Sequence, residues 1–135
     1  MTKGHVAREI VLWLVALFLA LVCLRSGFMK MPGAPGEPFW IRDSQGWGYP
    51  DAFRLVVGAA ELLSGVLLLV PRTAGYGALV FAIVMIGAIG THATHDEAGR
   101  LPFNLLLLAL SSVLFFARPP ARLQWTQPWS RRKRS

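Results

Sequence analysis

The chain has 135 residues, 54% of them hydrophobic and 16% charged, and its mean hydropathy is +0.48. A small soluble domain carries about a quarter charged residues, so this composition argues against a soluble domain and indicates an integral membrane protein. Fourteen basic and seven acidic residues give a net charge of +7. The basic residues lie between long apolar runs instead of forming one patch, which argues against a nucleic-acid-binding module and against nucleic acid as a partner.

Four apolar segments follow one another along the chain, each about 17–24 residues long, and a helix needs roughly 20 to cross the hydrocarbon core. The runs are continuous and do not alternate with polar residues, which predicts helices and not the strands of a membrane barrel. The sequence therefore predicts an all-α membrane protein, with a four-helix transmembrane domain at residues 1–118 and a basic cytoplasmic tail at 119–135. The predicted spans are residues 6–29, 51–70, 73–91 and 100–117.

The connections between these spans predict an antiparallel bundle. Pro71 and Arg72 form a very short turn, so the second and third spans must form a hairpin, and the connection at residues 92–100 is also short. The connection at residues 32–50 is long and rich in Gly, Pro and aromatic residues, which is typical of a lid or binding loop. The candidate lid residues are Trp40, Trp47 and Tyr49.

Lysine and arginine residues predict the orientation. The side that holds both termini and the second connection has nine of them, and the opposite side has five, which five acidic residues balance. The positive-inside rule then places both termini in the cytoplasm of a multi-pass inner-membrane protein, in contact with the lipid bilayer. Arg25 interrupts the end of the first apolar run, and no small-residue cleavage site follows directly, so we expect an uncleaved first span rather than a signal peptide.

Ionisable and amide side chains inside spans are costly in lipid and therefore point to function. At about 1.5 Å per residue, a polar residue from each predicted span reaches the outer half of the bundle. This convergence predicts one polar pocket, while Lys30 alone also fits a simple interfacial anchor. The candidate ligand-binding residues are Arg25, Lys30, Glu61, His92 and Asn104.

Glu61 lies on a small and polar helical stripe, and we expect Arg25 to be its ion-pair partner. Two interpretations stay open for this pair, which either fixes helix register or takes part in a ligand site. His92 and His95 share a spacing that suits a metal, but a third strong ligand is missing, so no metal site is predicted. Two alternatives remain for His92. It either donates a hydrogen bond to a ligand such as a quinone carbonyl or has no special role.

Three short motifs occur in the first three spans. They are Arg25-Ser26-Gly27-x-x-Lys30-Met31, Gly58-x-x-Glu61-Leu62-x-x-Gly65 with Pro71 after it, and Met85-x-x-Ala88 before His92. These motifs resemble the DoxX-like family. The resemblance implies a four-helix membrane bundle and covers about residues 10–117. The family takes its name from a membrane subunit of a thiosulfate:quinone oxidoreductase, and many members have no assigned activity.

The leading functional hypothesis is a quinone-associated subunit of a membrane redox complex. The chain has a single cysteine, Cys23, so no dithiol pair can form within it, and electrons would come from a redox partner protein. The alternative is a non-enzymatic scaffold or assembly factor in which the Arg25–Glu61 pair is structural. A proton-coupled transporter fits less well, because the chain shows no inverted repeat. Small residues of the third span, such as Ala74 and Ala78, suit bundle packing or a homo-oligomer interface.

Overall fold

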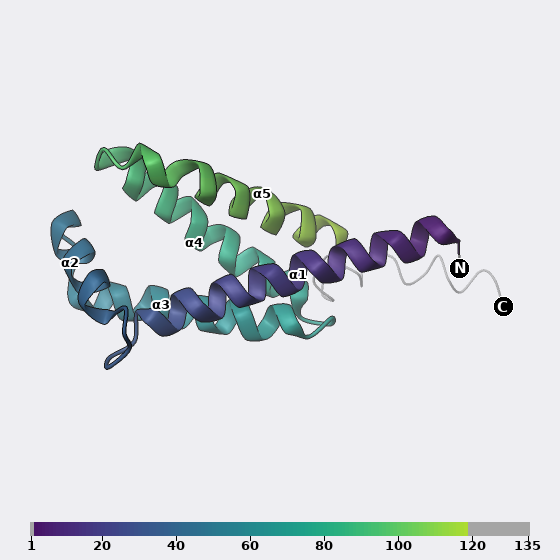
Figure 1. Ribbon diagram of the computed structural model, residues 1–135, viewed down its shortest axis with the longest axis horizontal. Helices are drawn as coiled ribbons and strands as arrows, with labels where there is room; N and C mark the ends of the chain where they lie inside the picture. Colours follow the sequence, from purple (N-terminus) through teal and green to yellow (C-terminus); the bar gives the residue numbers. More distant parts are fainter. Residues whose placement is uncertain (1, 119–135) are drawn as a thin grey trace, which may run out of the picture.

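The computed structural model describes residues 2–118, which contain five α-helices, one short 3-10 turn and no strand. Predictions about the tail at 119–135 lie outside the described residues. Figure 1 shows the helices in two layers, with α1 and α3 below and α4 and α5 above. The helices are α1 (Lys3–Met29), α2 (Glu37–Trp47), α3 (Asp51–Leu69), α4 (Ala74–Thr94) and α5 (Leu101–Ala117), and the 3-10 turn is η1 (Ala98–Arg100).

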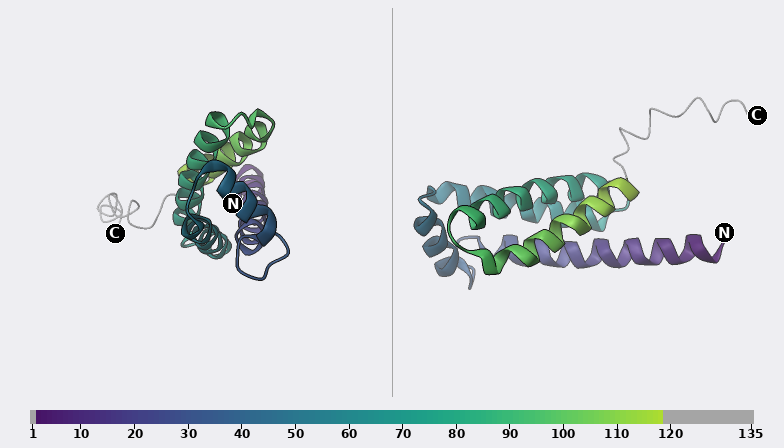
Figure 2. Two further views of the ribbon diagram at one scale, coloured as in Figure 1. Left: turned by 90° about the vertical axis from the view of Figure 1, so that its left-hand side faces the viewer. Right: turned by 90° about the horizontal axis from the view of Figure 1, so that it is seen from above.

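Four of the described helical stretches are long and apolar enough to cross a membrane: α1, α3, α4 and η1 together with α5. The predicted all-α fold with four spans is therefore confirmed for residues 2–118. Each helix runs antiparallel to the next span along the chain, as Figures 1 and 2 show. Packing is closest between α1 and α3, between α4 and α5, and between α3 and α4, while α1 and α5 touch over a shorter length.

The core of the bundle consists mainly of Ala and Leu side chains with Phe81, Met85 and Cys23, whereas many other large apolar side chains point outward. Phe81 and Leu114 are almost fully buried, while Phe116 and Val56 are exposed. An apolar exterior of this extent is typical of a surface that faces lipid. The buried apolar residues of the central cluster are Leu12, Ala16, Leu19, Ala20, Cys23, Leu68, Ala78, Phe81, Met85, Leu107 and Leu114.

The close approach of α1 and α3 depends on a glycine in each helix. A methyl group on Gly27 would lie 2.7 Å from the carbonyl oxygen of Gly58, which is too close for any other residue without a backbone shift. Small residues at such crossings allow backbones to approach within a membrane. This contact fixes the face of α1 that meets α3, and it therefore decides which polar side chains of α1 reach Glu61.

The long connection between the first two spans contains a helix that the sequence analysis did not predict. Helix α2 begins at Glu37 with Pro38 in its first turn, and it ends at Trp47, where it is capped by Gly48, whose φ of 78° is left-handed. It lies across one end of the bundle, which we call the α2 end (Figure 2). The opposite end carries the turn between α3 and α4.

Candidate functional site

Lys30 and Glu61 form a buried ion pair between α1 and α3. The Lys30 Nζ lies 2.8 Å from Glu61 Oε1, and the two side chains are 7% and 3% exposed. The same ammonium group donates to the Ser26 Oγ at 2.7 Å and to the Ser26 carbonyl oxygen at 3.3 Å. It also lies 3.9 Å from the centre of a Trp40 ring, at cation–π distance. Lys30 is thus surrounded by acceptors and an aromatic face.

The predicted pairing of Glu61 with Arg25 is wrong, because the partner of Glu61 is Lys30. Gly27 marks the face of α1 that meets α3, and at 3.6 residues per turn Lys30 lies about 60° from it around the helix axis. Arg25 lies about 160° from Gly27 and is exposed. The interpretation of the buried ion pair as a structural element therefore applies to Lys30 and Glu61 instead of Arg25 and Glu61.

The second carboxylate oxygen of Glu61 has no hydrogen-bond partner. Among the side-chain oxygen and nitrogen atoms of residues 2–118, Glu61 Oε2 is the buried one without a hydrogen-bond partner. An unsatisfied buried acceptor costs about 1–3 kcal/mol. Glu61 therefore combines one oxygen that is paired with Lys30 and one buried oxygen that has no partner among the described residues.

A cavity of about 840 Å³ lies next to this ion pair. It is lined by residues of the C-terminal part of α1, the N-terminal half of α3, the C-terminal half of α4, the start of α5 and helix α2, so it occupies the α2 end of the bundle. Most of its wall is apolar and aromatic, including Phe81, Met85 and Phe103. Of the candidate site residues, the structure places Arg25, Lys30, Glu61, His92, Asn104, Trp40 and Trp47 in the wall of this one cavity.

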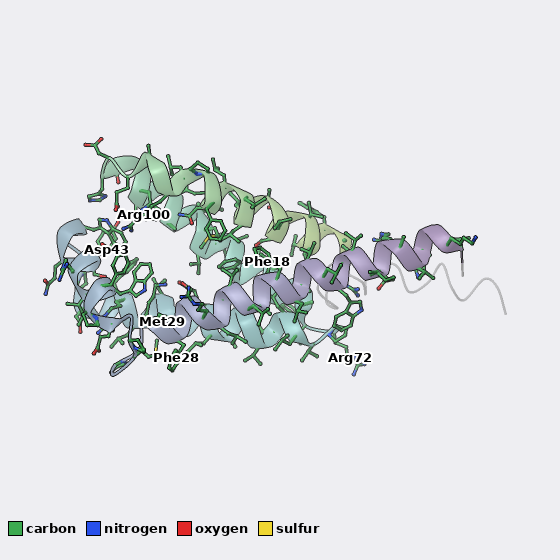
Figure 3. The ribbon with its side chains drawn as sticks, viewed as in Figure 1. Phe18, Phe28, Met29, Asp43, Arg72 and Arg100 are labelled. Atoms are coloured by element: carbon green, nitrogen blue, oxygen red, sulfur yellow. The ribbon has the colours of Figure 1, made fainter. Side chains whose placement is uncertain are left out.

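Helix α2 covers the cavity through polar contacts with the connection between α4 and α5. The Trp47 Nε1–H donates to Glu97 Oε1 at 2.7 Å, and the His92 Nδ1 lies 3.2 Å from the same oxygen. Arg100 donates to Asp43 Oδ2 at 2.7 Å, and Figure 3 shows these two labelled side chains together at this end of the molecule. The side chains of Glu97 and Arg100, both from the connection between α4 and α5, thus hold the covering helix at two points.

Glu97 lies between the spans, and its ionisation is linked to these contacts. Burial raises the pKa of its carboxyl, but hydrogen bonds with His92 and Trp47 and the positive charge of Arg100 lower it by more. The pKa of Glu97 therefore lies below its ordinary value, because its partners favour the charged form.

Tyr49 and His95 lie beside the cavity, outside its wall. The Tyr49 hydroxyl is 2.9 Å from the Thr91 Oγ1, and its ring lies 4.7 Å from that of Phe53. The His95 Nδ1 contacts the Thr91 carbonyl oxygen at 2.8 Å, whereas His92 faces Glu97. Tyr49 thus connects the end of the α2 segment to α4, and the two histidines do not converge.

Arg54 is a buried residue whose role the sequence analysis missed. It is 4% exposed, and its guanidinium group donates to the backbone carbonyl of Lys30 and contacts Asp51 at 3.2 Å and Glu37 at 3.7 Å. Arg54 lies in the wall of the cavity and ties α1, α2 and α3 together there. Its position seven residues before Glu61, on the same helical stripe, was the signal in the sequence.

Comparisons with known proteins agree with this architecture. A model of the DoxX-like family matches residues 14–114. The uncharacterized protein YwoB of Bacillus subtilis (strain 168) is 40% identical over 87 residues, which are 64% of this chain. The match spans 55% of the length of YwoB, and no solved structure matches the chain. Since the family model covers more than half of the chain and the described part contains four helices of spanning length, this multi-pass membrane protein belongs to the DoxX-like family.

Proposed function

We propose that this protein binds the head group of a membrane quinone in the cavity at the α2 end, as a subunit of a membrane redox complex. The observation that carries the proposal is the buried Lys30–Glu61 pair in the wall of an otherwise largely apolar cavity, with one carboxylate oxygen unused. Small-molecule sites are typically apolar clefts of about 300–1,000 Å³ with a few oriented polar groups. A quinone combines a flat apolar ring with polar oxygens and suits such a site.

In this proposal, each polar residue of the cavity has a separate task. Lys30 holds Glu61 in place, while Asn104 and His92 contact the head group from α5 and α4. Arg25 lies at the exposed margin, where its guanidinium group donates hydrogen bonds. Helix α2 covers the head group with Trp40 and Trp47. The electrons come from a separate protein, since a lone cysteine cannot form a dithiol pair within the chain.

The proposed location is the inner membrane, with both termini in the cytoplasm and the α2 end on the outer side. The distribution of lysine and arginine supports this orientation. Figure 3 shows Arg72 at the end opposite to α2, in the turn that this orientation places in the cytoplasm. The cavity then opens within the outer half of the bilayer.

The experiment is to purify the full chain in detergent, extract its lipids and search for quinones by mass spectrometry. The protein is then titrated with decylubiquinone and menadione, and tryptophan fluorescence is recorded. A matched pair of variants locates the site. A methyl group at Gly87 or Gly90 would meet nothing within 4 Å, but only Gly87 lines the cavity. We expect Gly87→Phe to weaken binding and Gly90→Phe to leave it unchanged. Absence of bound quinone together with no affinity for either compound would refute the proposal.

A scaffold or assembly factor is the second candidate function. The observation in its favour is that the Gly27–Gly58 contact and the Lys30–Glu61 pair together fix the register of α1 against α3. The amounts of Glu61→Gln and Lys30→Met protein in the membrane separate the two candidates. Loss of both variants from the membrane favours a structural role, and normal amounts with a lost cellular phenotype favour the ligand site.

A further inference from the structure

The hydrogen-bond donors of Lys30 are already used within the protein. An ammonium group has three N–H bonds. The Lys30 ammonium group donates to the Ser26 Oγ at 2.7 Å and to the Ser26 carbonyl oxygen at 3.3 Å, and it forms an ion pair with Glu61 Oε1 at 2.8 Å. The Trp40 ring covers the group at 3.9 Å. Lys30 is therefore engaged by three oxygen atoms of the protein and an aromatic face, and it orients Glu61.

Glu61 presents an acceptor to the cavity. Paired with the Lys30 ammonium, its carboxylate can only accept hydrogen bonds. Oε1 is used by Lys30, and Oε2 is buried without a partner among the described residues. The side chain is 3% exposed and belongs to the cavity wall, so a ligand head placed against Glu61 is the candidate partner for this oxygen.

In its neutral form, His92 adds a second acceptor at the same cavity. Its Nδ1 lies 3.2 Å from Glu97 Oε1, which also accepts from Trp47 and therefore acts as an acceptor. A neutral imidazole that donates through Nδ1 keeps Nε2 as an acceptor. His92 is 6% exposed and lines the cavity.

We infer that the deep part of this cavity takes a ligand head that donates hydrogen bonds, so that it binds a quinol more tightly than the corresponding quinone. This inference rests on the proposed function, from which it takes a quinone as the class of ligand. A quinol hydroxyl donates a hydrogen bond to Glu61 Oε2. A quinone carbonyl has no proton to donate, so its oxygen and Glu61 Oε2 would be two acceptors that face each other. Asn104 offers both donors and acceptors, so it serves both forms and does not discriminate between them.

The expected preference for the quinol is at least tenfold in the dissociation constant. A site built to bond a hydroxyl rejects an analogue that lacks the proton, because its own buried acceptor stays unpaired. By linkage, a tenfold preference for the reduced form raises the midpoint potential of the bound two-electron couple by about 30 mV.

The test is an anaerobic titration of the full chain in detergent with decylubiquinol and, separately, decylubiquinone, followed by tryptophan fluorescence. The Glu61→Gln variant should bind the two forms equally, because an amide both donates and accepts. The matched control is Ser64→Ala, one helical turn along α3. The Ser64 hydroxyl bonds to the Ala60 carbonyl at 2.8 Å and does not line the cavity, so the preference should persist in this control.

The outcomes separate this inference from the proposed function. Equal binding of the two forms by the wild type, or tighter binding of the quinone, overturns the inference and leaves the proposed function intact. A preference that persists in Glu61→Gln overturns it as well, whereas no binding of either form refutes the proposed function. If Glu61→Gln does not accumulate, the double variant Lys30→Met/Glu61→Leu replaces the pair by apolar residues and should also lose the preference.

Discussion

The indole N–H of Trp47 donates a hydrogen bond of 2.7 Å to Glu97, across 50 residues of sequence. Trp47 is the last residue of α2, and Glu97 lies between α4 and α5. Together with the contact between Asp43 and Arg100, this bond holds a short polar helix over the cavity. The covering of the site thus depends on side chains and not on the hydrophobic pattern of α2.

Trp47→Phe should loosen α2 without unfolding the bundle. The substitution keeps an aromatic ring but removes the donor to Glu97, which weakens the attachment by about 1 kcal/mol. Hydrogen–deuterium exchange of residues 37–47 should rise roughly fivefold. Trp13→Phe, in the exposed part of α1 far from α2, is the matched control. Unchanged exchange in the Trp47 variant would show that this bond does not hold the helix.

Acidification should weaken the same attachment. The pKa of Glu97 is lower in the folded protein than in the unfolded chain, where it is about 4.3. The ionised carboxylate therefore stabilises the folded protein at pH values above about 4.3, and this stability is lost as the pH falls through the folded pKa. Thermal unfolding in detergent measures the effect between about pH 6 and pH 3, because this range brackets the titration of a carboxyl group. Glu97→Gln should lose less stability over this range. The same pH dependence in the wild type and in Glu97→Gln would show that the ionisation of Glu97 does not cause this loss of stability.

Lys30→Met should destabilise the protein by about 3–5 kcal/mol, because it leaves the buried Glu61 carboxylate unpaired. The double variant Lys30→Met/Glu61→Leu should recover much of this loss, since apolar pairs often replace buried ion pairs without cost. Arg25→Ala should change stability by less than about 0.5 kcal/mol, because Arg25 is exposed. Thermal unfolding in one detergent compares the three. A larger loss for Arg25→Ala than for Lys30→Met would reverse the assignment of the ion pair.

Gly27→Ala should separate α1 from α3. The added methyl group would lie 2.7 Å from the Gly58 carbonyl oxygen and 2.9 Å from the Leu62 nitrogen, both backbone atoms that cannot rotate away. Overpacking of this kind costs about 1–3 kcal/mol. Gly90→Ala, where a methyl group meets nothing within 4 Å, is the control and should keep its unfolding temperature. Equal stability of both variants would show that the helices can move apart freely.

The membrane spans could be predicted from the sequence because lipid imposes a simple rule on each of them. A segment must be apolar over about 20 residues and must satisfy its own backbone, so length and composition identify a spanning helix. The short turn at Pro71 then makes α3 and α4 an antiparallel pair. The depth of each polar residue follows from the same rise per residue, and on this basis the sequence analysis grouped Glu61, His92 and Asn104.

Helix α2 could not be predicted on the same basis. Its 11 residues include two glycine or proline positions, and the segment is too short and too polar to be recognised as a membrane span. It is stabilised by partners that are distant in the chain, such as Arg100, which is 57 residues from Asp43. Contacts of this separation appear only when the spans have packed.

The sequence by itself determined that this chain is an apolar four-span bundle with polar groups near one end, because each span meets the lipid independently of the others. Only the tertiary structure decided that Glu61 pairs with Lys30 in the cavity wall and keeps one buried oxygen without a partner. The physical reason is rotation about the helix axis. Depth depends on position along one helix, whereas the facing residue depends on where Gly27 lets α1 approach Gly58 of α3.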